Sequence, residues 1–181
     1  YGMRFDIKTI ARTSGAAMDI ETATEPDAIG LTFPGFTFDR SDPVRFQGTI
    51  QNAGHGLLVL SGTASIIYNT TCARCLAPVR RDLSVGIRET FRSNRPIPGE
   101  RMQDTDPEEE DDSYGYDDYT VDITDALREN LLPALPIREL CKPDCAGICP
   151  VCGSDLNKGP CGCPSDPDGE NHPFGKLKDL L

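Results

Sequence analysis

Tryptophan is absent from this sequence of 181 residues, histidine occurs only twice, and apolar residues make up just 38%. That apolar content is enough for one modest core but not for several domains. No apolar run approaches the ~18 residues that a membrane-spanning helix needs. The N-terminus also lacks the basic and apolar regions of a signal peptide. We therefore expect a cytoplasmic protein with no membrane partner.

Catalytic motifs are missing as well. The sequence contains no Gly-x-Ser-x-Gly element, no phosphate-binding loop and no His-Glu-x-x-His. These motifs place a nucleophile, a nucleotide or a catalytic metal in several large enzyme classes. The acidic residues have no regular spacing for a metal site either. We predict that the protein is not an enzyme and has no small-molecule substrate.

Cysteine, by contrast, is plentiful. Six of the eight cysteines lie between Cys141 and Cys163, and Cys72 and Cys75 form a separate Cys-x-x-Cys pair. Four disulfides would suit a small secreted protein. Here there is no signal peptide, and neighbours such as Cys161 and Cys163 are awkward to cross-link. Grouped thiolates are soft ligands that suit zinc, so metal binding is the favoured interpretation.

The spacing of the cysteines predicts how they divide. A tight Cys-x-x-Cys turn aims both sulfurs at one ion, and a Cys-Gly-Cys element can close a site from two sides. The local site would consist of Cys149, Cys152, Cys161 and Cys163, and the long-range site of Cys72, Cys75, Cys141 and Cys145. Two zinc ions are thus preferred, although one zinc with the remaining cysteines free stays open. Four sulfurs leave no position for water, so both sites would be structural.

Alternation of apolar and polar residues predicts β-strands over 3–10, 44–51 and 79–92, and β-branched residues predict another over 56–71. Residues 21–43 are rich in Thr, Pro, Gly and Asp, so a long connection with little regular structure is expected there. A helix should begin near Asp122 or Thr124 and end at Pro133 or Pro136. The sequence therefore predicts an α+β protein with one main helix, a C-terminal cysteine-rich zinc-binding segment and an antiparallel sheet that could be barrel-like.

Four segments follow from this layout. They are an antiparallel β domain with the Cys-x-x-Cys hairpin (1–103), an acidic flexible loop (104–118), a strand and helix packing on the sheet (119–140), and the zinc-binding segment with an amphipathic tail (141–181). The acidic loop contains nine acids and no base. Removing these nine from a net charge of -11 leaves -2, so the body is nearly neutral. The acids repel one another and bury nothing, which favours a solvated spacer over a partner-binding element.

Arginine is concentrated between Arg74 and Arg101, where seven arginines face only three acids. Arg80, Arg88 and Arg92 would share one face of a strand. Arginine on the surface of a sheet suits contact with phosphates and stacked bases. These three residues and Arg74 are therefore candidate RNA contacts, with ordinary solvated strand charge as the alternative.

Several of these motifs occur together in one known protein family. They are, in order, Cys72-Ala-Arg-Cys75-Leu76, Val121-Asp-Ile-Thr, Leu-Leu-Pro-Ala-Leu-Pro136, the cysteine-rich segment with its Gly-Ile-Cys-Pro-Val-Cys-Gly core, and the closing Pro173-Phe-Gly-Lys-Leu-Lys-Asp-Leu. In this pattern the sequence resembles the YceD family, the large ribosomal RNA subunit accumulation proteins. The resemblance extends from roughly residue 44 to the end of the sequence.

The resemblance implies a non-enzymatic bacterial or plastid factor linked to the accumulation or processing of large-subunit ribosomal RNA, and hence to ribosome assembly. Its partner would be that RNA, a ribosomal protein or an assembly intermediate. Two other functions remain open. One is a zinc-stabilised protein-interaction adaptor without RNA contact, and the other is a thiol redox protein that uses Cys72 and Cys75.

Overall fold

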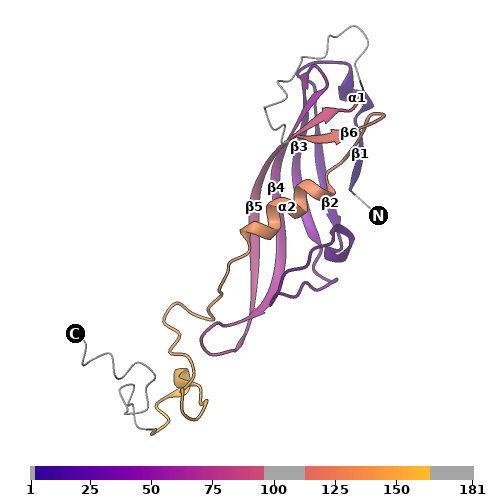
Figure 1. Ribbon diagram of the computed structural model, residues 1–181. Helices are drawn as coiled ribbons and strands as arrows, with labels where there is room; N and C mark the ends of the chain where they lie inside the picture. Colours follow the sequence, from indigo (N-terminus) through magenta and orange to yellow (C-terminus); the bar gives the residue numbers. More distant parts are fainter. Residues whose placement is uncertain (1–2, 96–112, 164–181) are drawn as a thin grey trace, which may run out of the picture.

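The computed structural model describes residues 3–95 and 113–163. Its elements are, in chain order, β1 (Arg4–Asp6), α1 (Lys8–Ala11), β2 (Ala17–Thr24), η1 (Pro26–Ile29), β3 (Val44–Gly54), β4 (Leu57–Thr71), β5 (Pro78–Ser93), β6 (Tyr114–Tyr116), β7 (Thr120–Asp122), α2 (Thr124–Ala134) and η2 (Leu156–Lys158). The molecule is elongated, with the long strands in one part and the cysteine-rich segment at one end (Figure 1). None of the described helices is long and apolar enough to cross a membrane.

The main sheet has five strands in the order β2-β3-β4-β5-β6, and β1 and β7 form a separate two-stranded sheet. Neighbouring strands are antiparallel, as predicted, except that β6 is parallel to β5. The expectation of a barrel-like sheet is wrong, because the described strands form open sheets with β2 and β6 at the edges of the larger one. Closure would require a ladder between these edges, and β6 has only 3 residues to offer against the 8 of β2.

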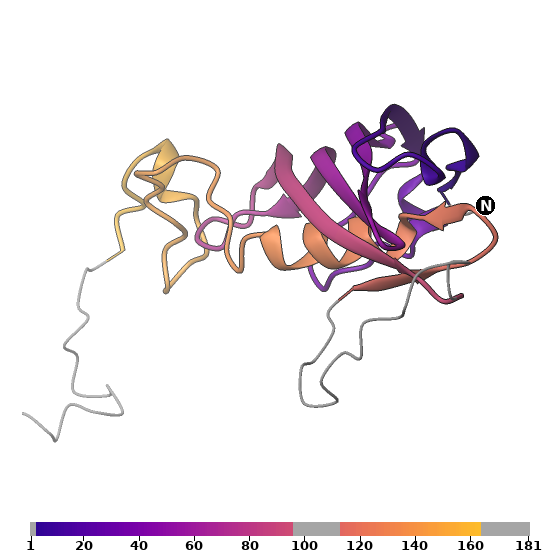
Figure 2. The ribbon, with the colours of Figure 1, turned by 90° about the horizontal axis from the view of Figure 1, so that it is seen from above.

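One face of the sheet carries the core. Alternate positions of β3, β4 and β5 point to this face and are mostly apolar, as expected for a half-buried sheet. The core side chains on these strands include Phe46, Ile50, Leu58, Leu60, Ile66, Ile87 and Phe91. Helix α2 lies against this face (Figure 2) and buries Ala126, Leu127 and Leu131 there. The helix begins where the Asp122 carboxylate accepts a hydrogen bond from Thr124 N at 3.0 Å, in the predicted region.

A pair of glycines lets an aromatic ring lie flat on the sheet inside this core. Gly48 on β3 pairs with Gly62 on β4. A Cβ on either residue would lie within 2.8 Å of the Phe46 ring. The ring therefore covers backbone that no other side chain could share, and its apolar area compensates for the two missing side chains.

Two local predictions differ from the structure. The strand predicted over 3–10 ends at Asp6, because the Asp6 carboxylate accepts a hydrogen bond from Lys8 N at 2.9 Å and the chain turns into α1. The long connection predicted over 21–43 begins inside β2, which pairs with β3 along its whole length. Alanine, aspartate and glutamate, which are depleted in strands, make up half of β2, so composition did not identify this strand.

The predicted acidic loop over 104–118 lies outside the described residues as far as Asp112, and Tyr114–Tyr116 within it form β6. The predicted amphipathic tail, within 164–181, also lies outside the described residues.

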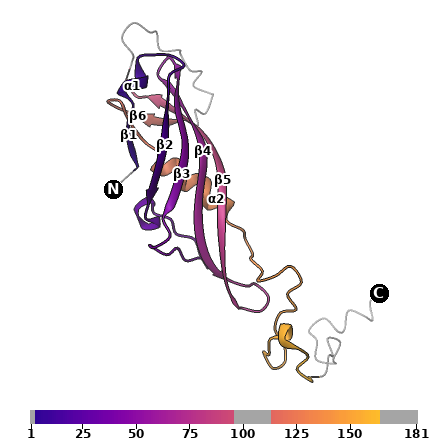
Figure 3. The same ribbon diagram turned by 180° about the vertical axis from the view of Figure 1, so that it is seen from behind.

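The second face of the sheet is bare. Seen from behind, strands β2 to β5 have no helix in front of them (Figure 3). Outward positions at the centre of this face are small or polar, and the exposed ones include Asp19, Gln47, Thr63, Ser84 and Arg88. Leu57, Val59 and Ile67 point outward nearer the two ends of β4. The sheet thus has an apolar face that holds α2 and a second face with a polar centre.

Candidate metal centres

The first cysteine pair forms the tip of the β4–β5 hairpin. The turn closes through backbone hydrogen bonds from Cys72 N to Ala77 O (2.8 Å) and from Leu76 N to Cys72 O (2.9 Å). Arg74 N lies 3.5 Å from Cys72 Sγ. Leu76 follows with a φ of 61°, a left-handed conformation that an L-residue adopts only in a tightly fixed turn. The hairpin tip therefore presents its sulfurs on a defined backbone.

The chain that follows α2 returns to this tip. Ala73 N donates a hydrogen bond to Glu139 O at 2.8 Å, and the Tyr68 hydroxyl donates to the Glu139 carboxylate at 2.9 Å. Arg81 on β5 lies 3.7 Å from the same carboxylate and donates to Cys141 O at 3.2 Å. These contacts bring the C-terminal segment to the hairpin independently of the sulfurs. None of these supporting residues was predicted from the sequence.

Four sulfurs meet where the two segments join, and we call Cys72, Cys75, Cys141 and Cys145 the bridging cluster. Their Sγ atoms all lie within 4.8 Å of one another. Cys72 Sγ is 3.7 Å from Cys145 Sγ, and Cys75 Sγ is 3.6 Å from Cys141 Sγ. A tetrahedral zinc with Zn–S bonds of about 2.3 Å separates its sulfurs by about 3.8 Å. The geometry fits a metal ion bound by four sulfurs, and none of the four cysteines forms a disulfide.

Burial and charge explain why this donor set suits a cation. Cys72 and Cys145 are buried, and they pack with Val79 in a small apolar cluster separate from the main core. Burial opposes ionisation of Cys72, but backbone N–H donors outweigh it and lower the pKa of Cys72 to about 6. Burial and the neighbouring sulfurs raise the pKa of Cys141 to about 12. Four thiolates cannot share this space without a positive charge between them, and a divalent ion supplies it.

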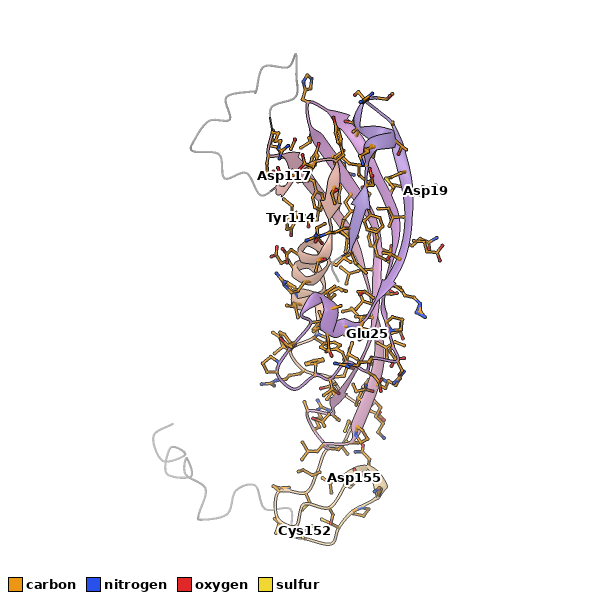
Figure 4. The ribbon with its side chains drawn as sticks, turned by 90° about the vertical axis from the view of Figure 1, so that its right-hand side faces the viewer. Asp19, Glu25, Tyr114, Asp117, Cys152 and Asp155 are labelled. Carbon is orange, nitrogen blue, oxygen red and sulfur yellow. The ribbon has the colours of Figure 1, made fainter. Side chains whose placement is uncertain are left out.

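The second group lies farther along the chain, and we call Cys149, Cys152, Cys161 and Cys163 the local cluster. Its sulfurs also lie within 4.8 Å of one another. Cys149 N donates to Ser154 O at 2.8 Å, which folds the Cys-Pro-Val-Cys-Gly turn back on itself. Cys152 lies at the end of the molecule remote from the sheet (Figure 4). These are the two sets of four that the spacing predicted, and whether metal fills them remains a prediction.

The local cluster is more open to solvent than the bridging cluster. Cys149 is buried, but Cys152 is exposed. A hydrogen bond with the Ser154 hydroxyl lowers the pKa of Cys152 to about 6. Cys152 and its neighbours in turn raise the pKa of Cys163 to about 12. The same combination of ionised and protonated thiols therefore occurs here, with a more accessible thiolate.

Asn157 connects the two clusters. It lies in η2, within the loop of the local cluster, and its side-chain amide donates to Cys145 Sγ at 3.4 Å. Its carbonyl oxygen accepts from Ala146 N at 2.9 Å. The amide hydrogen bond is the main cause of the lowered pKa of Cys145. An amide donor to a metal-bound sulfur is a typical supporting contact of a metal site, and the cysteine pattern gave no signal for it.

Three of the four predicted RNA-contacting arginines share one face of β5, and the fourth lies apart. Arg80, Arg88 and Arg92 occupy outward positions of β5, on the bare face, as predicted. Arg80 there pairs with Asp42 at 2.6 Å, a carboxylate only 15% exposed. Arg74 donates to Cys145 O at 2.9 Å and so lies beside the bridging cluster. Arg45 on β3 shares that face and was not predicted.

Comparison with known proteins places these features in a family. A family model described as large ribosomal RNA subunit accumulation protein YceD matches residues 60–181. The chain is 31% identical over 159 residues to uncharacterized proteins of Mycobacterium tuberculosis and Mycobacterium bovis, which covers 87% of this chain and 72% of each relative. A Mycobacterium leprae protein is 25% identical over 153 residues, covering 84% of this chain and 66% of that relative. No solved structure is significantly similar to the chain.

Proposed function

Because the chain belongs to the YceD family, we propose that it is a non-enzymatic factor, structured by two zinc ions, that supports the accumulation of large-subunit ribosomal RNA. The observation that carries this proposal is the bridging cluster. Four sulfurs from two distant parts of the chain converge there with the spacing of a closed tetrahedral site. A closed site stabilises structure and leaves no position for a substrate or a reactive water.

The buried sulfurs support a structural role over a redox role for Cys72 and Cys75. A thiolate that attacks disulfides or oxidants has to be accessible. Cys72 is fully buried, and its sulfur already has Cys145 Sγ and Arg74 N as neighbours. The proposal includes a reducing compartment such as the cytoplasm, in which the thiolates stay available for metal.

A protein-interaction adaptor is the second candidate function, and the distribution of exposed apolar residues favours it. Among the described residues, five large apolar side chains are exposed. Four of them lie in or beside the cysteine-rich end, namely Leu76, Ile137, Ile148 and Val151. Apolar residues held out on rigid metal-bound turns can anchor a protein partner, such as a ribosomal protein.

The experiment that tests the proposal measures ribosomal RNA in cells of the source organism that lack the protein. We expect a lowered ratio of large-subunit to small-subunit ribosomal RNA, restored by the wild-type gene. A Cys75→Ser/Cys141→Ser variant should fail to restore it, because two ligands of the bridging cluster are gone. An unchanged ratio in cells without the protein contradicts the proposed function. Full rescue by the double variant contradicts the structural role of the cluster.

To separate the adaptor from direct RNA contact, tagged protein is recovered from cells with and without nuclease treatment. A ribosomal protein that remains bound after nuclease treatment, and is lost from a Leu76→Ser/Val151→Ser variant, supports the adaptor. Loss of large-subunit components after nuclease treatment supports contact through RNA.

A further inference from the structure

The bare face of the sheet has a centre made of hydroxyl side chains. We call Thr49, Ser61, Thr63, Ser65 and Ser84 the hydroxyl face. Thr49 pairs with Ser61 across β3 and β4, and Ser65 pairs with Ser84 across β4 and β5. From the usual strand spacing and rise, the five side chains cover roughly 10 Å by 14 Å. Within the described residues, no hydrogen bond occupies their side-chain oxygens, which face solvent on the side remote from α2.

Two basic side chains lie at opposite corners of the hydroxyl face, and two acidic side chains lie along its β2 edge. Arg88, on β5, pairs with Ser61 of β4, and Arg45, on β3, pairs with Ser65 of β4. Neither arginine forms an ion pair with a described residue. Strand geometry places these two arginines at opposite corners of the patch, with Cα atoms roughly 16 Å apart. Asp19 and Glu21 lie along the β2 edge; Figure 4 shows Asp19 on the side of the sheet away from α2.

Aromatic residues are absent from this face. No outward position of β2, β3, β4 or β5 carries Phe, Tyr or Trp. Proteins that bind single-stranded RNA on a sheet stack its bases on aromatic rings. The arginine face therefore has no aromatic ring on which the expected stacked bases could lie. Contact with RNA would have to involve the sugar–phosphate backbone.

A shallow hollow deepens the same region. It has a volume of about 600 Å³, and its lining includes Glu21, Arg45, Gln47, Thr63 and Ser84. Hydroxyl and amide groups can each donate and accept a hydrogen bond. The lining therefore suits a partner that is rich in hydroxyl groups and has negative charge near Arg45.

We propose that the hydroxyl face, with Arg45 and Arg88, binds double-stranded RNA across its minor groove. This inference rests on the proposed link to ribosomal RNA. The minor groove of an RNA duplex is wide and shallow and displays 2′-hydroxyls between two phosphate strands. The hydroxyl face meets the ribose hydroxyls, and each arginine meets one phosphate strand. Recognition is of shape and sugar, without base sequence.

A second copy of the chain fits this face less well than an RNA duplex does. Asp19 and Arg88 occupy the same register row at opposite sides of the sheet, so two faces could pair with these charges exchanged. A stable dimer, however, needs an apolar centre and a large contact area. Here the centre consists of hydroxyl groups, which lose their water without gaining apolar contact.

The test uses the reduced, zinc-loaded full-length protein and fluorescence anisotropy. The probes are a blunt RNA duplex of about 16 base pairs, the length that minor-groove RNA-binding domains span, a DNA duplex of the same sequence, and each RNA strand alone. We expect the RNA duplex to bind at least about tenfold more tightly than the other probes, since only it displays paired 2′-hydroxyls. A duplex of scrambled sequence should bind equally well.

Two variants locate the site. Thr63→Glu/Ser65→Glu places negative charge in the hydroxyl face and should abolish duplex binding. Arg45→Ala/Arg88→Ala should weaken binding and lower the slope of log affinity against log salt by about two. The matched control is Arg12→Ala/Arg128→Ala, which removes the arginine that follows α1 and one on α2, away from the bare face, and should leave affinity nearly unchanged. Zinc content and the thermal midpoint confirm that each variant is folded.

Three results would overturn the inference. The first is equal affinity for RNA and DNA duplexes. The second is duplex binding that the Thr63→Glu/Ser65→Glu variant retains. The third is a protein that binds no duplex and sediments as a dimer which Thr63→Glu dissociates, since a second copy would then occupy the face. If any of these occurs while cells without the protein still lose large-subunit ribosomal RNA, the proposed function stands and only this surface assignment fails.

Discussion

The bridging cluster and the local cluster each consist of four cysteines, but they stabilise different parts of the molecule. The bridging cluster joins cysteines separated by 66 and 73 positions, is half buried, and lies among hydrogen bonds from Ala73, Arg74 and Arg81. The local cluster closes a single loop and exposes Cys152. The comparison teaches that ligand chemistry does not determine what a metal stabilises. What the metal stabilises depends on the sequence separation of its ligands and on their burial. A link between distant residues removes far more conformational entropy from the unfolded chain than a local one.

The largest expected effect comes from removing one ligand of each cluster in turn. Cys75→Ser should lose the bridging zinc and with it roughly 10 kcal/mol of metal-binding free energy. Amides of residues 72–77 and 135–148 should then exchange rapidly with solvent, while β3 to β5 stay protected by their own core. The measurement is hydrogen exchange followed by mass spectrometry.

The matched variant is Cys152→Ser in the local cluster. It should lose one zinc as well, but rapid exchange should be confined to residues 149–163. Identical exchange patterns for the two variants would show that the clusters do not differ in what they stabilise.

A smaller effect is expected at the residue that connects the clusters. Asn157→Ala removes the amide donor to Cys145 Sγ and the acceptor of Ala146 N. Loss of such a supporting contact typically weakens metal binding by about 10- to 100-fold. Competition with a zinc chelator should show this loss for the bridging zinc. Asn94→Ala, at the far end of the sheet where its side chain binds Asp117, is the control and should have wild-type zinc affinity.

The turn between the clusters gives the next prediction. Gly147 has a φ of 78°, and a Cβ there would lie 3.3 Å from Arg74 O. Gly147→Ala should therefore destabilise the folded segment by about 1–2 kcal/mol, seen as weaker zinc retention under chelator. Gly86→Ala is the matched control, since nothing lies within 4 Å of its Cβ position and its φ is not left-handed. Equal effects of the two alanines would argue against a constrained turn.

An effect of similar size to that of Gly147→Ala is expected at the tyrosine that links the sheet to the returning chain. Tyr68→Phe keeps the ring contact with Phe36 but removes the hydrogen bond to Glu139, at a cost of about 1–2 kcal/mol. Burial, with the Glu139 carboxylate, raises the pKa of Tyr68 from 10.0 to about 12. The folded state therefore favours the neutral phenol, and this contribution is complete below pH 10 and lost between pH 10 and 12.

Urea unfolding of the wild type at pH 9 and pH 11.5 should show that loss, and Tyr68→Phe should reduce it. A variant with the wild-type pH dependence would mean that other groups cause the alkaline destabilisation.

Much of this architecture could be predicted because alternation and spacing are local signals. Much of β3 and β5 alternates between apolar and polar residues, and β4 is rich in β-branched residues. Helix α2 begins beside Asp122 and ends at Ala134, between Pro133 and Pro136. The cysteine pairs follow from the close spacing within each turn. These features depend on residues a few positions apart, for which sequence is sufficient.

The remaining features depend on contacts between distant residues. β6 is only a Tyr-Gly-Tyr segment at the end of an acidic run, and it is a strand because it pairs in parallel with Phe91 and its neighbours. Arg80 lies on the predicted face, but its ion pair with Asp42, 38 positions away, had no signal in the strand pattern. Asn157 supports Cys145 only once both clusters have formed. The openness of the sheet depends likewise on where its edges lie, which no strand pattern specifies.

The most direct test of the account is stepwise zinc removal from the reduced, purified protein, followed in parallel by native mass spectrometry and hydrogen exchange. We predict two zinc ions per chain, one for each cluster. The more exposed local site should lose its ion first, with rapid exchange limited to 149–163. Loss of the second ion should then expose the amides of 72–77 and 135–148 together, as the two distant segments separate. A chain that binds no zinc, or that keeps these amides protected after both ions are gone, would contradict the account.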